Sequence, residues 1–246
     1  KWSRTAGAGG YILYRKTPGG TYARIANIKH GNVTSYIDRT AKAGISYTYT
    51  VRAYSGTSMS GWRNPGTILR LADPTVQSAL NATGGTQIKW SRSAGAGGYI
   101  VYRRNKGGIW KRIAYINSQN VLSYTDKSAK AGVTYDYTVR AFKGSLLSDW
   151  HNYKTIRRLN NPTLKSVTSS RYGINIRWNK SPYATGYIIY RKTGKGSWTR
   201  IAKINNASAT GFTDTTAAKG VKYTYTIRSY SGSYLSYWNS VRSAVR

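Results

Sequence analysis

Hydrophobic and polar residues alternate along short stretches of this chain, and glycines separate the stretches. In YTYTVRAY, residues 47–54, the odd-numbered residues are two tyrosines, a valine and an alanine, and an extended strand turns all four to one face. The other face carries Thr48, Thr50, Arg52 and Tyr54. This pattern predicts a central strand whose apolar face lies on a core.

Nearly the same stretch returns at residues 135–142 and 223–230, which indicates an internal repeat. The period is 88 residues, and no insertion or deletion disturbs its landmarks. They are Trp2, Trp90 and Trp178; Tyr11, Tyr99 and Tyr187; Asp38, Asp126 and Asp214; and Trp62, Trp150 and Trp238. The chain therefore consists of three copies of one domain-sized unit.

Each copy contains about seven β-rich runs separated by glycine-containing turns, and no run has the 3.6-residue period of a helix. In the second copy the candidate strands are residues 75–80, 86–92, 98–104, 109–116, 122–126, 135–142 and 147–158. The pattern predicts an all-β sandwich of antiparallel strands in each repeat.

Two proline-containing joints, LADP at residues 71–74 and LNNP at 159–162, mark the expected domain boundaries. We expect repeats at residues 1–72, 73–160 and 161–246. Because both joints are short, the repeats are expected to stack end to end as a semi-rigid rod.

The composition argues against most kinds of catalytic site. The 246 residues include no cysteine, two histidines and six acidic residues, all of them aspartates. Paired carboxylates, metal sites and most catalytic triads need several such groups close together. We therefore predict a non-enzymatic protein with no catalytic residues, no metal and no cofactor.

Basic residues dominate the charge, because 39 lysines and arginines give a formal net charge of +33. Residues 1–72, 73–160 and 161–246 contain 11, 14 and 14 of them, so the whole length is basic. Such a surface either attracts an anionic partner or serves to keep the protein in solution. No apolar run is long enough for a transmembrane helix.

Three segments of the second copy resemble the fibronectin type III family, in the variety common in secreted and surface proteins of bacteria. IKW at 88–90 is similar to the family's second strand, GYIVYRR at 98–104 to its third, and AGVTYDYTVRA at 131–141 to its sixth. The resemblance implies tandem immunoglobulin-like β-sandwiches with a tyrosine corner, in which a phenol hydroxyl bonds to upstream backbone.

From this resemblance we expect six structural core residues, Trp2, Trp90 and Trp178 with the corner residues Tyr47, Tyr135 and Tyr223. The chain departs from the family in lacking the usual proline before the corner glycine. It also has no Arg-Gly-Asp sequence, so the integrin-binding loop of some animal members is not expected.

The first repeat is incomplete at its N-terminus, because one residue precedes Trp2 whereas 17 residues of the second repeat precede Trp90. A first strand and most of a second strand are missing. We expect the chain to be an excerpt from a longer array. The alternative is that a neighbouring molecule donates the missing strand.

The candidate binding site is the solvent face of the third and sixth strands, where aromatic and basic residues interleave. It comprises Tyr14, Lys16, Arg52 and Tyr54; Tyr102, Arg104, Arg140 and Phe142; and Tyr190, Lys192, Arg228 and Tyr230. Rings could stack on sugars or bases while cations meet phosphate, sulfate or carboxylate. Alternatively, these residues form cross-strand pairs that only stabilise the sheet.

Other recurring residues have simpler interpretations. Trp62, Trp150 and Trp238 are expected to cover the core or an edge, with a sugar platform as the alternative. Trp110 and Trp198 replace Tyr22 near a sheet edge. Asp38, Asp126 and Asp214 are expected to cap turns.

These features predict an extracellular, non-enzymatic spacer and adhesive array that binds an anionic polysaccharide, teichoic acid or nucleic acid through its basic surface. Two alternatives remain open. The chain could be a subunit of a self-assembling fibre, binding other copies of itself, or an accessory carbohydrate-binding segment of a larger secreted hydrolase.

Overall fold

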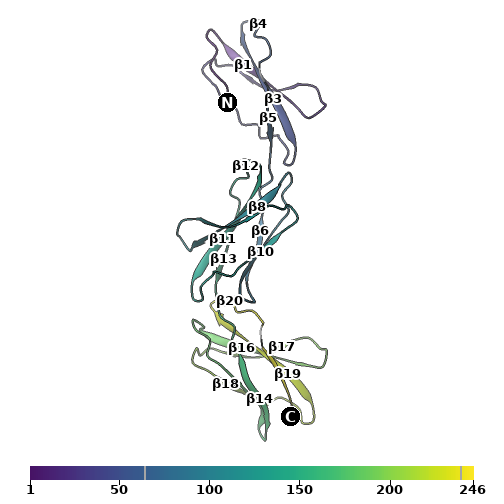
Figure 1. Cartoon of the computed structure of the whole chain (residues 1–246), viewed down its shortest axis with the longest axis vertical. Helices are drawn as coiled ribbons and strands as arrows, with labels where there is room; N and C mark the ends of the chain where they lie inside the picture. Colours follow the sequence, from purple (N-terminus) through teal and green to yellow (C-terminus); the bar gives the residue numbers. More distant parts are fainter. Residues whose placement is uncertain (64, 239) are drawn as a thin grey trace.

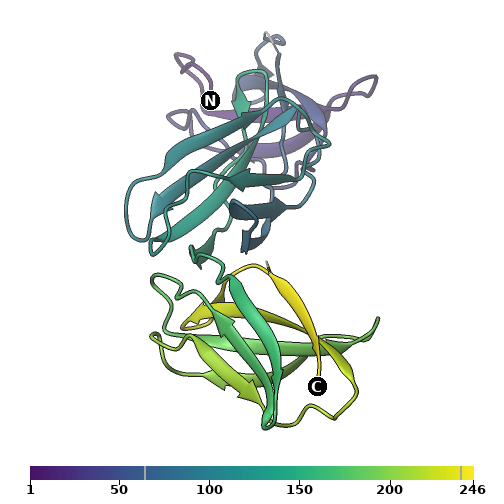
Figure 2. The same ribbon diagram turned by 60° about the horizontal axis from the view of Figure 1, so that its bottom comes forward.

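The computed structural model of the protein describes residues 1–63, 65–238 and 240–246, and every regular element in these ranges is a β-strand. The prediction of an all-β fold is confirmed. Three groups of strands follow one another along the long axis (Figure 1). Figure 2 shows the same succession from a second angle, with the C-terminal repeat nearest the viewer. The domain boundaries at residues 72/73 and 160/161 stay predictions.

The second repeat is a sandwich of two antiparallel sheets. The smaller has the order β10–β7–β6, and the larger has the order β9–β8–β11–β12 with β13 also paired to β11. The strands are β6 (Val76–Ala82), β7 (Gly85–Trp90), β8 (Gly98–Asn105), β9 (Lys111–Ile116), β10 (Ser123–Asp126), β11 (Thr134–Lys143), β12 (Leu146–Leu147) and β13 (Lys154–Arg157).

The third repeat has the same architecture. Its strands are β14 (Leu164–Ser170), β15 (Gly173–Trp178), β16 (Gly186–Thr193), β17 (Thr199–Ile204), β18 (Gly211–Asp214), β19 (Lys222–Ser231), β20 (Tyr234–Leu235) and β21 (Val241–Val245). The single strand predicted for residues 147–158 is wrong, because β12 pairs with one end of β11 and β13 with the other. The break between them contains Trp150.

The first repeat has one sheet among the residues that the structure describes. Its strands are β1 (Gly10–Lys16), β2 (Ala23–Ile28), β3 (Ser46–Ser55), β4 (Ser58–Met59) and β5 (Gly66–Leu69). Residues 35–38, the counterpart of β10, form no strand because the neighbour corresponding to β7 is missing. An open hollow of about 740 Å³ is lined by core-facing residues of this sheet, among them Leu13 and Val51, and by residues 146–149 of the second repeat.

Tryptophan and tyrosine fill the centre of each complete sandwich. Trp90 and Trp178 are each 1% exposed, and each contacts the ring of the tyrosine nine residues later at 5.5 and 5.4 Å between centroids. Trp2 makes the same contact with Tyr11 but is only half-buried. The second sheet that covers Trp90 and Trp178 has no counterpart among the described residues of the first repeat, so the core position of Trp2 stays a prediction.

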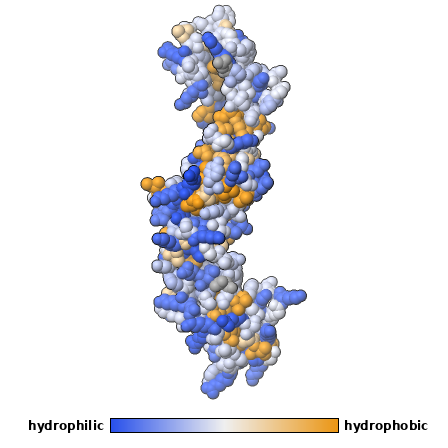
Figure 3. All heavy atoms as spheres, viewed as in Figure 1, coloured by the Kyte–Doolittle hydropathy of each residue, from blue (hydrophilic) through white to orange (hydrophobic). Residues whose placement is uncertain are grey.

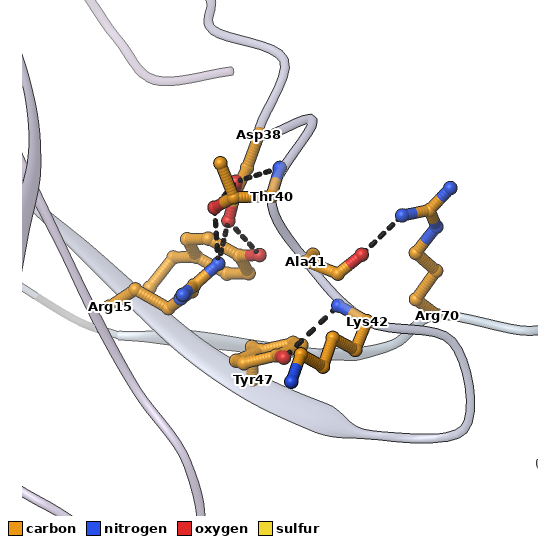
Figure 4. Close-up of polar contacts among 8 residues, drawn as sticks. Arg15, Asp38, Thr40, Ala41, Lys42, Tyr47 and Arg70 are labelled. Atoms are coloured by element: carbon orange, nitrogen blue, oxygen red, sulfur yellow. Dashed lines mark hydrogen bonds and ion pairs between the residues drawn. The ribbon is translucent and has the colours of Figure 1, made fainter.

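The tyrosine corner is present in all three repeats. The hydroxyls of Tyr47, Tyr135 and Tyr223 accept hydrogen bonds from the backbone N–H five residues upstream, at 3.1, 3.1 and 3.2 Å. All three tyrosines are buried. Figure 4 shows the bond from Lys42 to Tyr47. The corner ties the connection between sheets to the start of the central strand.

The joint between the second and third repeats is held by specific contacts. Asn81, at the end of β6, is 4% exposed and donates to the carbonyl oxygens of Arg157 and Leu235, both at 3.0 Å. Tyr183 packs on Gly132, where an added Cβ would lie 2.6 Å from its ring. Tyr183 has a φ of 63°, a left-handed backbone conformation that favours glycine. These contacts support the predicted restriction of bending at this joint.

Candidate anion-binding face

A stack of aromatic rings and cations lies on the outer face of the larger sheet in every repeat. Alternation along β8 turns Tyr102 and Arg104 outward, and β11 adds Arg140. The break after β12 brings Trp150 over these residues, and Trp110, immediately before β9, stacks on it. We call this set the cation–aromatic ladder. Its members are Lys16, Tyr22, Trp62, Arg52 and Tyr14; Arg104, Trp110, Trp150, Arg140 and Tyr102; and Lys192, Trp198, Trp238, Arg228 and Tyr190.

In the second repeat the ladder runs from one arginine to the other. The guanidinium carbon of Arg104 lies 4.4 Å from the ring centroid of Trp110, which stacks on Trp150 at 6.0 Å and 20°. Arg140 lies 4.8 Å from the Trp150 centroid, and its Nε donates to the carbonyl oxygen of Ser148 at 2.6 Å. The edge of Tyr102 meets Trp150 at 4.8 Å.

The other two ladders have the same geometry with a lysine at one end. Lys16 lies 5.0 Å from the ring of Tyr22, and Lys192 lies 5.1 Å from that of Trp198. Arg52 and Arg228 lie 5.0 and 4.7 Å from the tryptophans that follow them in their repeats. Because rings and cations already face one another, a ladder offers a ligand its charged N–H groups and ring edges more readily than open ring faces.

Sequence reasoning did not assign the tryptophans of β12–β13 and their counterparts to this face. Trp62 and Trp150 are 54% and 48% exposed, so of the expected core or edge positions, the core position is wrong for both. They cover the outside of the sheet instead. The three matching positions, each ten residues after a recurring arginine, were the available signal. These tryptophans reach the outside of the sheet because the strand is broken there. The alternation of hydrophobic and polar residues does not reveal that break.

Tyr54, Phe142 and Tyr230 lie apart from the ladders, although they are on the same strands. Their rings fill the space above Gly10, Gly98 and Gly186, where an added Cβ would come within 2.5–2.7 Å of them. Phe142 and Tyr230 are 4% and 8% exposed, and Tyr115 stacks on Phe142 at 4.4 Å. The expected exposure of these two rings is therefore wrong, and they offer no face to a ligand.

Three of the recurring arginines are engaged in partly buried ion pairs. Arg15, Arg103 and Arg191 donate to the carboxylates of Asp38, Asp126 and Asp214 at 2.7, 2.7 and 2.8 Å. The same carboxylate oxygens accept from tyrosine hydroxyls on the central strand, at 2.9, 2.7 and 2.7 Å. The other oxygen accepts from a backbone N–H two residues later, as expected of a turn-capping aspartate. These arginines hold the fold together and are not part of the ladders.

The surroundings of these aspartates change their acidity. Burial acts to raise the pKa of Asp38, but hydrogen bonds from Thr40, Arg15 and Tyr49 outweigh it and lower the pKa to about 2 (Figure 4). The pKa of Asp126 and Asp214 is lowered for the same reasons. Burial and the bond to Asp38 raise the pKa of Tyr49 to about 12.

These pKa shifts predict acid sensitivity. A carboxyl whose pKa is depressed in the folded state stabilises the protein above its unfolded pKa of about 4, and this contribution is lost as pH falls toward 2. We expect the free energy of unfolding in urea to fall between pH 4 and 2. Asp38→Asn should remove the first repeat's part of this pH dependence. An unchanged stability between pH 5 and 2 would contradict the assignment.

The described part of the chain contains no cluster of three histidine, cysteine or acidic residues that could hold a metal ion. Over the same residues, no helix has the length and apolarity needed to cross a membrane.

Comparisons with known proteins identify relatives for parts or most of the chain. Exoglucanase B of Cellulomonas fimi is 26% identical over 252 residues, which cover 89% of this chain and 21% of that protein. Amylopullulanase of Thermoanaerobacterium saccharolyticum is 37% identical over 67 residues, covering 27% of this chain and 5% of that protein. The chain thus spans a small part of either relative. No family model matches the sequence.

Among solved structures, an Fn3-like protein from Clostridium thermocellum is 32% identical, and the match covers 34% of this chain and 90% of that one with a TM-score of 0.30. The sequence identity to that protein, the strand order and the tyrosine corner support the same assignment. With the order β9–β8–β11 opposite β10–β7–β6 and a tyrosine corner in every copy, the chain belongs to the fibronectin type III family.

Proposed function

We propose that the chain is a non-catalytic spacer in a secreted bacterial protein and that its ladders bind an anionic polysaccharide. The observation that carries this proposal is the imbalance of charge on a repeated face. Four of the 39 basic side chains pair with a carboxylate in residues 1–63, 65–238 and 240–246. Figure 3 shows hydrophilic side chains projecting along the whole length of the visible face.

The ladder geometry favours an anionic sugar polymer over a single-stranded nucleic acid. Proteins that bind single strands stack bases on free aromatic faces. In the ladders those faces meet other rings and cations, as with Trp110 between Arg104 and Trp150. Guanidinium groups oriented by stacking keep donors for sulfate, carboxylate or phosphate groups. One ladder per repeat also suits a linear polymer, because several weak contacts on one rod add by multivalency.

Short dextran sulfate and uncharged dextran of the same chain length test this proposal, because they differ only in charge. We expect the whole chain to bind dextran sulfate at low salt and not to bind dextran, as measured by calorimetry. Equal binding of both polymers would contradict the proposal. Tighter binding of a single-stranded oligonucleotide than of dextran sulfate at matched charge would point to nucleic acid instead.

A second candidate function is an accessory segment of a polysaccharide-degrading enzyme. The similarity to an exoglucanase and an amylopullulanase supports it. In that role the array would space a catalytic domain from its substrate. Binding to insoluble cellulose or starch that persists at high salt would favour this role over binding through charge.

A further inference from the structure

In the second ladder a carboxylate lies beside one terminal cation, and that cation is an arginine instead of the lysine of the other two ladders. Asp136 on β11 lies directly opposite Arg104 on β8, and its Oδ2 accepts a hydrogen bond from the Arg104 Nε at 2.9 Å. At the corresponding positions Thr48 lies opposite Lys16 and Thr224 lies opposite Lys192. The second ladder therefore contains its own anion, whereas the first and third present a lysine with threonine beside it.

The cross-strand bond from β11 to β13 does not need a carboxylate at this position. Thr155 donates to the Asp136 Oδ1 at 2.7 Å. In the first repeat the hydroxyls of Thr48 and Thr67 bond at 2.9 Å, and in the third repeat Thr224 and Ser243 bond at 2.9 Å. A threonine at position 136 could therefore make the same cross-strand bond to its neighbour on β13.

The position of Asp136 makes it an effective competitor for a ligand. Its side chain is 3% exposed, and Arg104 is held over Trp110 and 5.3 Å from the ring of Tyr153. A buried, fixed carboxylate is screened by solvent less than an exposed one. An incoming sulfate would have to share the guanidinium with this carboxylate and would also be repelled by it.

We propose that Asp136 weakens anion binding at the second ladder, so that the array holds an anionic polysaccharide mainly at its first and third repeats. This inference rests on the proposed function and adds to it an unequal distribution of sites. Position 136 is then the residue that determines which repeats bind.

The test uses the whole chain, with short dextran sulfate as the probe and NMR signals of the indole N–H groups as the readout. In the unmodified protein the signal of Trp198 should shift at a lower probe concentration than that of Trp110. In Asp136→Thr the midpoint for Trp110 should fall about two- to five-fold, the effect of one exposed ion contact. Circular dichroism checks that the variant is folded.

Asp73→Asn is the matched control, because it also removes one carboxylate from the second repeat. Asp73 Oδ1 accepts from the N–H of Asp149 at 2.8 Å, and Asn161 accepts from Tyr237 in the same way at 3.0 Å at the next joint. An asparagine can therefore keep this bond. The control should leave the order of the two midpoints unchanged.

Thr224→Asp provides the reverse test and covers the case in which Asp136→Thr does not fold. It should raise the midpoint for Trp198 toward that of Trp110. Equal midpoints in the unmodified protein, or an Asp136→Thr shift no larger than that of Asp73→Asn, would overturn this inference while leaving polymer binding intact. If no indole signal moved at low salt, the proposed function itself would be wrong.

Discussion

Trp90→Ala is expected to lower the free energy of unfolding of the second repeat by about 3–5 kcal/mol. Trp90 is 1% exposed and lies between the two sheets, so its removal leaves a cavity that the surrounding strands cannot close fully. Hydrogen exchange of the β11 amides in the whole chain, followed in urea, reports on this repeat separately from the other two.

Trp150→Ala is the matched control for this prediction, because it removes the same side chain from the outside of the same repeat. Trp150 is 48% exposed and its contacts are with ladder residues. We expect it to cost about 1 kcal/mol, the scale of an exposed cation–π contact. Equal losses for the two variants would show that Trp90 does not form the core.

Binding to dextran sulfate is expected to weaken by about 10³-fold between 50 and 200 mM salt. On DNA, a loss of affinity of this size corresponds to contacts with about six phosphate groups, because each contact releases condensed counterions. The three ladders supply six cations, two at the ends of each stack. Calorimetry across a salt series measures the effect. A nearly constant affinity would indicate stacking on sugar rings instead of charge.

Much of the fold could be predicted because the 88-residue repeat shows the same pattern of residues in three copies. The alternation in residues 47–54 identified the central strand, and the resemblance to the fibronectin type III family identified Tyr47, Tyr135 and Tyr223 as corner residues. Side-chain alternation in a strand follows from backbone geometry, so a pattern of eight residues is informative without knowledge of the neighbours.

The site was predicted only in part, because its composition depends on contacts between distant residues. Alternation correctly brought Tyr102, Arg104 and Arg140 to one face. It placed Phe142 there as well, but a glycine on the neighbouring strand leaves room for that ring to sink against the sheet. Likewise, the ion pair of Arg103 with Asp126 spans 23 residues, and only its threefold recurrence could have suggested it.

The ladder arginines themselves are expected to contact the anionic polymer. The most direct measurement is the slope of log affinity against log salt for dextran sulfate, compared between two triple variants. Arg52→Gln, Arg140→Gln and Arg228→Gln remove one cation from each ladder, and Arg24→Gln, Arg112→Gln and Arg200→Gln remove the same charge from exposed positions outside them. We predict a slope smaller by about two to three for the ladder variant and a much smaller change for the control. Equal slopes for the two variants would contradict the account.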